Sequence, residues 1–160
     1  MPNFWLDANI FIDARNGPYA FDIAPAFWLA LDAQLRAGTV GVPAMVYREL
    51  VGKPDDISTW IRQRKGAGGC VAPDQDVQEN FRQVANYVGA TYQYPQAADF
   101  LKGADGWVIA HAIGNGSRVV THESELRPNA NKARIPDVSN HFGVGCCRVT
   151  DMLRSLLIRF

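Results

Sequence analysis

Short apolar segments that alternate with helical segments constrain the fold of this chain most strongly. We expect strands at Phe4-Trp5-Leu6, Thr39 to Pro43 and Arg118 to Thr121, and a weaker one at Ile135 to Asp137. Apolar residues recur at helical spacing between them. Strands that are separated by helices run parallel and are covered by helices on both faces. The sequence therefore predicts an α/β fold, a three-layer α/β/α sandwich with a short, mainly parallel central sheet.

The remaining pattern predicts helices and a single domain. Asn9 is placed to cap the first helix, Gly66 to Gly69 form a loop, and a new element begins at Pro95. The 160 residues fit one domain, 1–160, whose closing helix at about 149–158 packs on the domain or on a partner. The other helices are expected at 24–36, 44–51, 57–64, 75–88 and 104–113.

Composition excludes several classes of protein. Sixteen basic residues balance sixteen acidic ones, so the chain is not a strongly basic nucleic-acid binder, although a local groove can still be basic. Cys70, Cys146 and Cys147 lack the spacing of a zinc site or a disulfide framework. Apolar stretches are too short for a membrane helix and no signal peptide is evident. We therefore expect a cytoplasmic protein with no membrane association.

Acidic residues occur where the pattern calls for apolar ones. Asp7 ends the first strand and Glu123 follows the third, while Asp105 and Glu49 share the apolar stripes of two helices. The carboxyl ends of parallel strands meet at one edge, so these four acids are expected to converge. Two carboxylates 4 Å apart repel by about 4 kcal/mol at an effective dielectric of 20. Such a cluster either takes up protons or binds Mg²⁺ or Mn²⁺, which prefer oxygen ligands.

Each acid also has an ordinary structural explanation. Asp7 is placed to cap the helix that follows it, and Asp105 is favoured near a helix start by the helix dipole. Glu49 can pair with a nearby basic residue such as Lys53, and Glu123 can be a loop charge. Only the joint placement of the four acids at one sheet edge favours a metal site.

Four segments occur in an order and at a spacing similar to those of the PIN-domain nucleases. The resemblance covers about residues 3 to 150 and, within the superfamily, points to bacterial proteins of toxin–antitoxin type. The segments are Trp5-Leu6-Asp7-Ala8-Asn9, Val42-Pro43 with Tyr47-Arg48-Glu49-Leu50, Ala104 to Ala112, and Val119-Val120-Thr121-His122-Glu123.

The resemblance implies a PIN-like fold and a Mg²⁺- or Mn²⁺-dependent endoribonuclease with one or two ions. Its catalytic and metal-binding acids would be Asp7, Glu49, Asp105 and Glu123. Activated water would attack the phosphodiester in line, leaving 5′-phosphate and 3′-hydroxyl ends. Asn9 and Thr121 would be supporting polar residues of the same site.

The fourth acid departs from the usual pattern of the family. The family more often has Asp where Glu123 stands, so Asp137 is an alternative ligand and Asp99 is a second-tier candidate. The departure at Glu123 also keeps open a catalytically inactive PIN-like module that binds RNA or protein. A phosphatase of the HAD type is disfavoured, because Asn9 stands where that chemistry needs a second Asp.

The resemblance also implies partners: an RNA substrate, a cognate antitoxin protein and a possible homodimer. Trp107 is a candidate for base stacking. We expect structural or surface roles for His111 and His122. Candidate RNA contacts are the basic residues Arg15, Lys102, Lys132 and Arg134.

Overall fold

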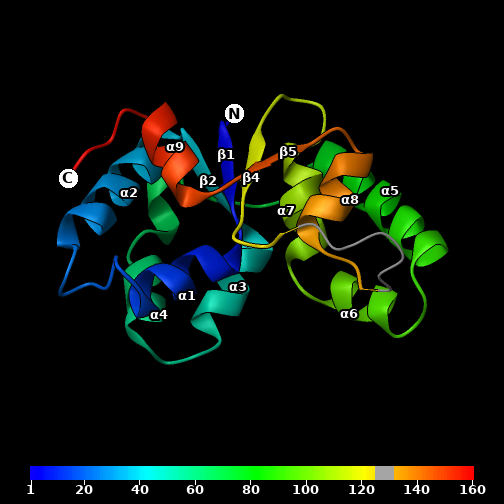
Figure 1. Cartoon of the computed structure of the whole chain (residues 1–160), viewed down its shortest axis with the longest axis horizontal. Coiled ribbons are helices and arrows are strands. Elements are labelled where there is room, and N and C mark those ends of the chain that lie inside the picture. Colours follow the sequence, from blue (N-terminus) through cyan, green and yellow to red (C-terminus); the bar gives the residue numbers. More distant parts are fainter. Residues whose placement is uncertain (125–131) are drawn as a thin grey trace.

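A parallel sheet forms the centre of the computed structural model, which describes residues 1–124 and 132–160 (Figure 1). The strand order is β3-β2-β1-β4-β5, and every neighbouring pair is parallel. The first strand of the chain is therefore the middle strand of the sheet. The strands are β1 (Phe4–Leu6), β2 (Val40–Pro43), β3 (Cys70–Val71), β4 (Arg118–Val120) and β5 (Gly145–Cys147).

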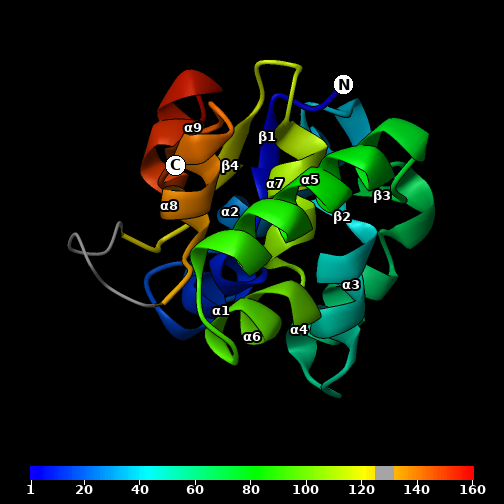
Figure 2. The ribbon, with the colours of Figure 1, turned by 90° about the vertical axis from the view of Figure 1, so that its right-hand side faces the viewer.

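Helices cover both faces of this sheet, which confirms the expected α/β/α sandwich. On one face lie α2 (Pro25–Ala37) and α9 (Val149–Ser155). The other face is covered by α5 (Gln75–Thr91), α7 (Asp105–Ala112) and α8 (Ile135–His141) (Figures 1 and 2). Toward the carboxyl ends of the strands lie α1 (Ala8–Asn16), α3 (Ala44–Val51), α4 (Asp56–Arg62) and α6 (Gln96–Lys102), and a 3₁₀ turn, Lys65–Ala67, precedes β3.

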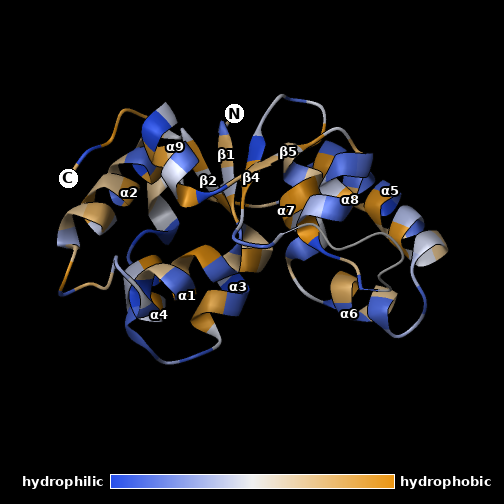
Figure 3. Cartoon of the chain, viewed as in Figure 1, coloured by the Kyte–Doolittle hydropathy of each residue, from blue (hydrophilic) through white to orange (hydrophobic). Residues whose placement is uncertain are grey.

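The apolar stripes read from the sequence form the core between these layers. The hydrophobic parts of the chain concentrate in the strands and in the helix sides that face them (Figure 3). In α2, for example, Phe27, Leu31 and Leu35 are buried. Val149 and Met152 of α9 are buried as well, so the closing helix packs on its own chain. Within the described part of the chain, no helix has the length and apolar character needed to cross a bilayer.

Three local expectations were wrong. The segment from Ile135 to Asp137 is not a strand but the first turn of α8, where Pro136 fits because an amide donor is not needed there. Strands β3 and β5 were not expected. Strand β3 has two residues, too few to give a pattern, and Gly145-Cys146-Cys147 of β5 carries no β-branched residue. Asn9 does not cap α1, because the helix already begins at Ala8.

The contact between β1 and β2 generates a stability prediction. Gly41 lies opposite Trp5, and a Cβ at Gly41 would stand 2.7 Å from Trp5 Cζ3 and 2.8 Å from Pro2 Cγ. We expect Gly41→Ala to lower the free energy of unfolding by about 1–3 kcal/mol through overpacking, measured by urea denaturation. Gly66→Ala is the matched control, since nothing lies within 4 Å of its added carbon. Equal midpoints for the two variants would contradict this packing.

Candidate functional site

Asp7 lies at the centre of the candidate site because it directly follows the middle strand. It is 2% exposed, and its Oδ2 accepts a hydrogen bond from Thr121 Oγ1 at 3.1 Å. Burial raises the pKa of the Asp7 carboxyl to about 6, and the charge of Glu123 acts in the same direction. The Thr121 hydrogen bond opposes this shift. Thr121 therefore joins the ends of β1 and β4 and orients Asp7, as a supporting polar residue would.

Asp105 is the first residue of α7 and carries the second strongly shifted carboxyl group. Burial raises its pKa from 3.8 to about 7. The negative charges of Asp7, Glu123 and Glu49 add to this effect, in that order. The four acids predicted from the sequence therefore lie close enough to repel one another, although their positions span 117 residues (123 − 7 + 1).

Backbone amides hold the two glutamates. Glu49 Oε1 accepts a hydrogen bond from the amide of Ala104 at 2.8 Å, just before α7 begins. Glu123 Oε2 accepts one from the amide of Ile135 at 2.9 Å, at the start of α8. A carboxylate offers about four lone-pair sites, so each glutamate keeps acceptor capacity for another ligand. These contacts fix the glutamates at the edge of the cluster.

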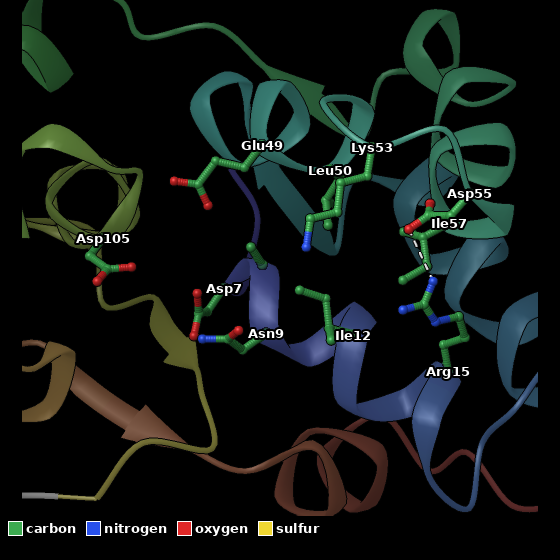
Figure 4. A pocket seen from close by; sticks show the side chains of 11 residues that line it. Asp7, Asn9, Ile12, Arg15, Glu49, Leu50, Lys53, Asp55, Ile57 and Asp105 are labelled. Carbon is green, nitrogen blue, oxygen red and sulfur yellow. Dashed lines mark hydrogen bonds and ion pairs between the residues drawn. The ribbon is translucent and has the colours of Figure 1, made fainter.

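Two cavities meet at Asp105. The first, of about 240 Å³, is lined by Asp7, Asn9, Glu49 and Asp105, with α1, α3 and α4 forming its other walls (Figure 4). The second, of about 610 Å³, lies toward α6 and α8. Its lining includes Asp99, Glu123 and Lys132 as well as Asp105. The acids therefore stand between two open spaces rather than at the end of one.

The structure separates the two alternative acids. Asp99 lines the second cavity together with Glu123 and Asp105. Asp137 lines neither cavity. It lies instead near Tyr92, whose pKa is raised by burial first, then by Tyr87 and by the charge of Asp137. Glu123, which acts on both Asp7 and Asp105, is thus better placed than Asp137 to complete the cluster.

Only some of the candidate RNA-contact residues line the two cavities. Arg15 lines the first cavity, but its guanidinium pairs with Asp55 at 3.0 Å and with Asp56 at 3.1 Å. Lys132 lines the second cavity, whereas Lys102 is exposed and lines neither.

Arg134 precedes α8 and is half-buried. Its Nε has no hydrogen-bond partner among the described residues.

The histidines lie outside the acidic cluster. His111 is 3% exposed and its ring packs against Trp5 at a centroid distance of 4.5 Å. Burial lowers its pKa to about 4, so it is neutral at ordinary pH. His122 Nδ1 lies 2.8 Å from Asp13 Oδ2, a pairing that spans 109 residues and that the sequence did not reveal.

Trp107 is not a free stacking platform. Its ring stacks on Phe81 of α5 at a centroid distance of 3.9 Å and an interplanar angle of 4°. One face of the indole is therefore covered by the protein itself.

The donor set of the cluster suits a hard divalent cation. Its four acids offer only oxygen ligands, and a cation would offset both the burial and the repulsion that raise the pKa values of Asp7 and Asp105. As the side chains stand in the described residues, no three His, Cys, Asp or Glu side chains form a group that could hold a metal ion. The donor atoms are thus of the type that Mg²⁺ and Mn²⁺ prefer, but the described side chains do not stand as an assembled ligand group.

Comparison with known proteins defines a PIN-like α/β fold. The chain is similar to a solved structure described as "Structure of FitAB bound to IR36 DNA fragment", with 18% sequence identity and a TM-score of 0.52. The match covers 91% of this chain and 94% of that one. No curated protein matches the sequence. The chain belongs to the family described as "Domain of unknown function (DUF4411)", which matches residues 4–160.

The raised pKa of Asp105 predicts a pH-dependent stability. Between its ordinary value of 3.8 and its folded value of about 7, the folded protein binds more protons than the unfolded chain. This group therefore makes stability fall as pH rises through that window. In EDTA, we expect Asp105→Asn to gain about 1–3 kcal/mol relative to wild type between acidic and mildly alkaline pH, measured by urea denaturation.

Asp22→Asn is the control for this experiment, because Asp22 is exposed. Its stability should follow wild type at each pH. A difference in the free energy of unfolding between Asp105→Asn and wild type that stays constant over the whole pH range would show that folding does not raise the pKa of the Asp105 carboxyl.

Proposed function

We propose that this chain is a metal-dependent endoribonuclease that hydrolyses phosphodiester bonds in RNA. The observation that carries the proposal is that the four acids converge at one edge of the sheet, where burial and neighbouring negative charge raise the pKa values of Asp7 and Asp105. Strongly shifted groups in a cleft are typical of functional sites. The PIN-like fold and the resemblance of the four acidic segments support a nuclease over other uses of such a cluster.

Each acid has a distinct role in this proposal. Asp7, held by Thr121, and Asp105 would bind Mg²⁺ or Mn²⁺ directly, with Glu49 and Glu123 completing the oxygen ligands. A divalent cation in such a site supplies an activated water and neutralises charge on the reacting phosphate. Asp105, which lines both cavities, is placed to orient the water, and Asn9 is exposed at the first cavity to contact the substrate.

A second candidate function is a PIN-like module that binds RNA or a protein without cleaving it. The observation that favours it is that backbone amides engage both glutamates, while no group of three potential ligands is assembled among the described residues. In that case the cluster would be a structural remnant of a catalytic site. Metal binding separates the two functions.

The resemblance to toxin–antitoxin proteins supports a cognate antitoxin as a partner and a possible homodimer in the cytoplasm. The described surface offers apolar side chains for such contacts: Ile23 and Leu29 are 72% and 69% exposed, and Leu157 at the C-terminal end is 82% exposed. These partners and this location belong to the proposal.

The first test is Mn²⁺ binding by calorimetry, followed by cleavage of RNA and of DNA of the same sequence. We expect one or two ions to bind wild type, and EDTA-sensitive cleavage of the RNA. Asp105→Asn should abolish metal binding and lower cleavage by at least about 100-fold, the scale on which a key electrostatic group acts. Metal-independent RNA binding without cleavage would instead support the binding module.

A pair of variants tests which residue is the fourth acid. We expect Glu123→Gln to weaken Mn²⁺ binding and cleavage about tenfold or more, because its charge acts on both Asp7 and Asp105. Asp137→Asn should leave both quantities within about twofold of wild type, since Asp137 lines neither cavity. Activity and affinity measured side by side would reject this assignment if the two variants behaved the other way round.

A further inference from the structure

The first cavity has acidic side chains at one end and a lysine beside them, an arrangement that metal binding alone does not explain. The carboxylates of Asp7, Glu49 and Asp105 stand at one end (Figure 4). Lys53, which follows α3, extends its ammonium group into the space between these acids and α4. A cation beside a cluster of acids is well placed to bind an anionic group of a ligand whose other part lies at the acids.

The charge of Lys53 is not taken up by an ion pair within the described residues. Its closest competitor for a ligand, Arg15, is occupied by Asp55 and Asp56 at 3.0 and 3.1 Å. Asp55 also caps α4, because its Oδ1 accepts a hydrogen bond from the amide of Ser58 at 2.8 Å. At that end of the cavity the guanidinium of Arg15 is held by two carboxylates, so among the described lining residues Lys53 is the basic side chain without a contact ion pair.

Apart from Asn9, the uncharged part of the cavity lining is apolar. Ile12 of α1, Leu50 of α3 and Ile57 of α4 line it between its charged parts. At about 240 Å³ the space lies below the ~300–1,000 Å³ of pockets that enclose drug-sized ligands. It therefore suits one sugar–base unit, and a base that enters it must leave its stack, which favours a single strand over a duplex.

We propose that this cavity is a nucleotide subsite for single-stranded RNA. Lys53 binds the phosphate next to the bond that is cut, and the side chains of Ile12, Leu50 and Ile57 pack against the sugar and base of the intervening nucleotide. This inference rests on the proposed function, in which a divalent cation bound by the acids would hold the scissile phosphate. The substrate strand then continues from Asp105 into the second cavity, on the side of Lys132.

The test measures phosphate contacts directly. A fluorescein-labelled oligouridylate is titrated in EDTA with Asp105→Asn, chosen because its cleavage is expected to be at least about 100-fold slower, at several potassium chloride concentrations. For a single strand, the logarithm of affinity falls against the logarithm of salt with a slope of about 0.7 per phosphate contact. We expect the added Lys53→Gln substitution to reduce that slope by about 0.7. In wild type, Lys53→Gln should raise KM about three- to fivefold and leave kcat unchanged.

Arg82→Gln is the matched control, because it removes the same charge from an exposed side chain of α5 whose ion pair within the described residues is with Glu79 on its own helix. It should leave both the salt slope and KM unchanged. An equal loss of slope in the two variants would mean that Lys53 acts through net charge alone, which overturns the subsite.

The outcomes separate the subsite from the nuclease. If wild type cleaves RNA and Lys53→Gln changes neither slope nor KM, the subsite is wrong and the nuclease stands. If wild type does not cleave but the slope depends on Lys53, the subsite stands and the catalytic proposal fails. Lys53-dependent binding of polyglutamate, with no binding of the oligouridylate, would overturn the subsite in favour of an acidic protein partner.

Discussion

The gathering of four carboxylates at one edge of the sheet, where burial and mutual repulsion raise the pKa values of Asp7 and Asp105, is the constraint on which the rest of the site depends. Asp7 sits at the end of the middle strand, so the segments that follow the neighbouring strands β2 and β4 bring Glu49 and Glu123 to it from either side. Asp105 approaches from α7, across the sheet face. A parallel sheet with β1 at its centre gathers these acids without any of them being close in sequence, and the fold tolerates the charge because protons, or a cation, can offset it.

Much of the fold follows from local pattern because its strands and helices carry their own signals. The apolar run Phe4–Leu6 and the helical stripe of α2 are plain in the sequence. The β-branched Ile135 predicted a strand, but Pro136, whose fixed backbone suits the first turn of a helix, follows it and the segment begins α8. Strand β5 exists through its pairing with β4, from Arg118 to Val120, and Gly-Cys-Cys alone does not encode it.

The acids of the site could be named from the sequence since each interrupts an apolar stripe or ends a strand. Their partners could not. The amide of Ala104 lies 55 residues from Glu49, and only the folded chain shows that it, rather than Lys53, meets that carboxylate. The same holds for Lys53, whose place in the first cavity depends on how the segment after α3 turns. Long-range geometry, not residue type, decides these contacts.

The amides of Ala104 and Ile135 give the site a structural role of its own. Each lies at the start of a helix, α7 or α8, and each donates to a glutamate of the cluster. A ligand that draws either glutamate away would remove the acceptor of that amide, whereas one that binds only the remaining oxygens would leave the hydrogen bond in place. The hydrogen-exchange rates of these two amides therefore report whether the glutamates still accept their hydrogen bonds. A ligand bound at the acids would be detected as a change in local unfolding at the starts of α7 and α8.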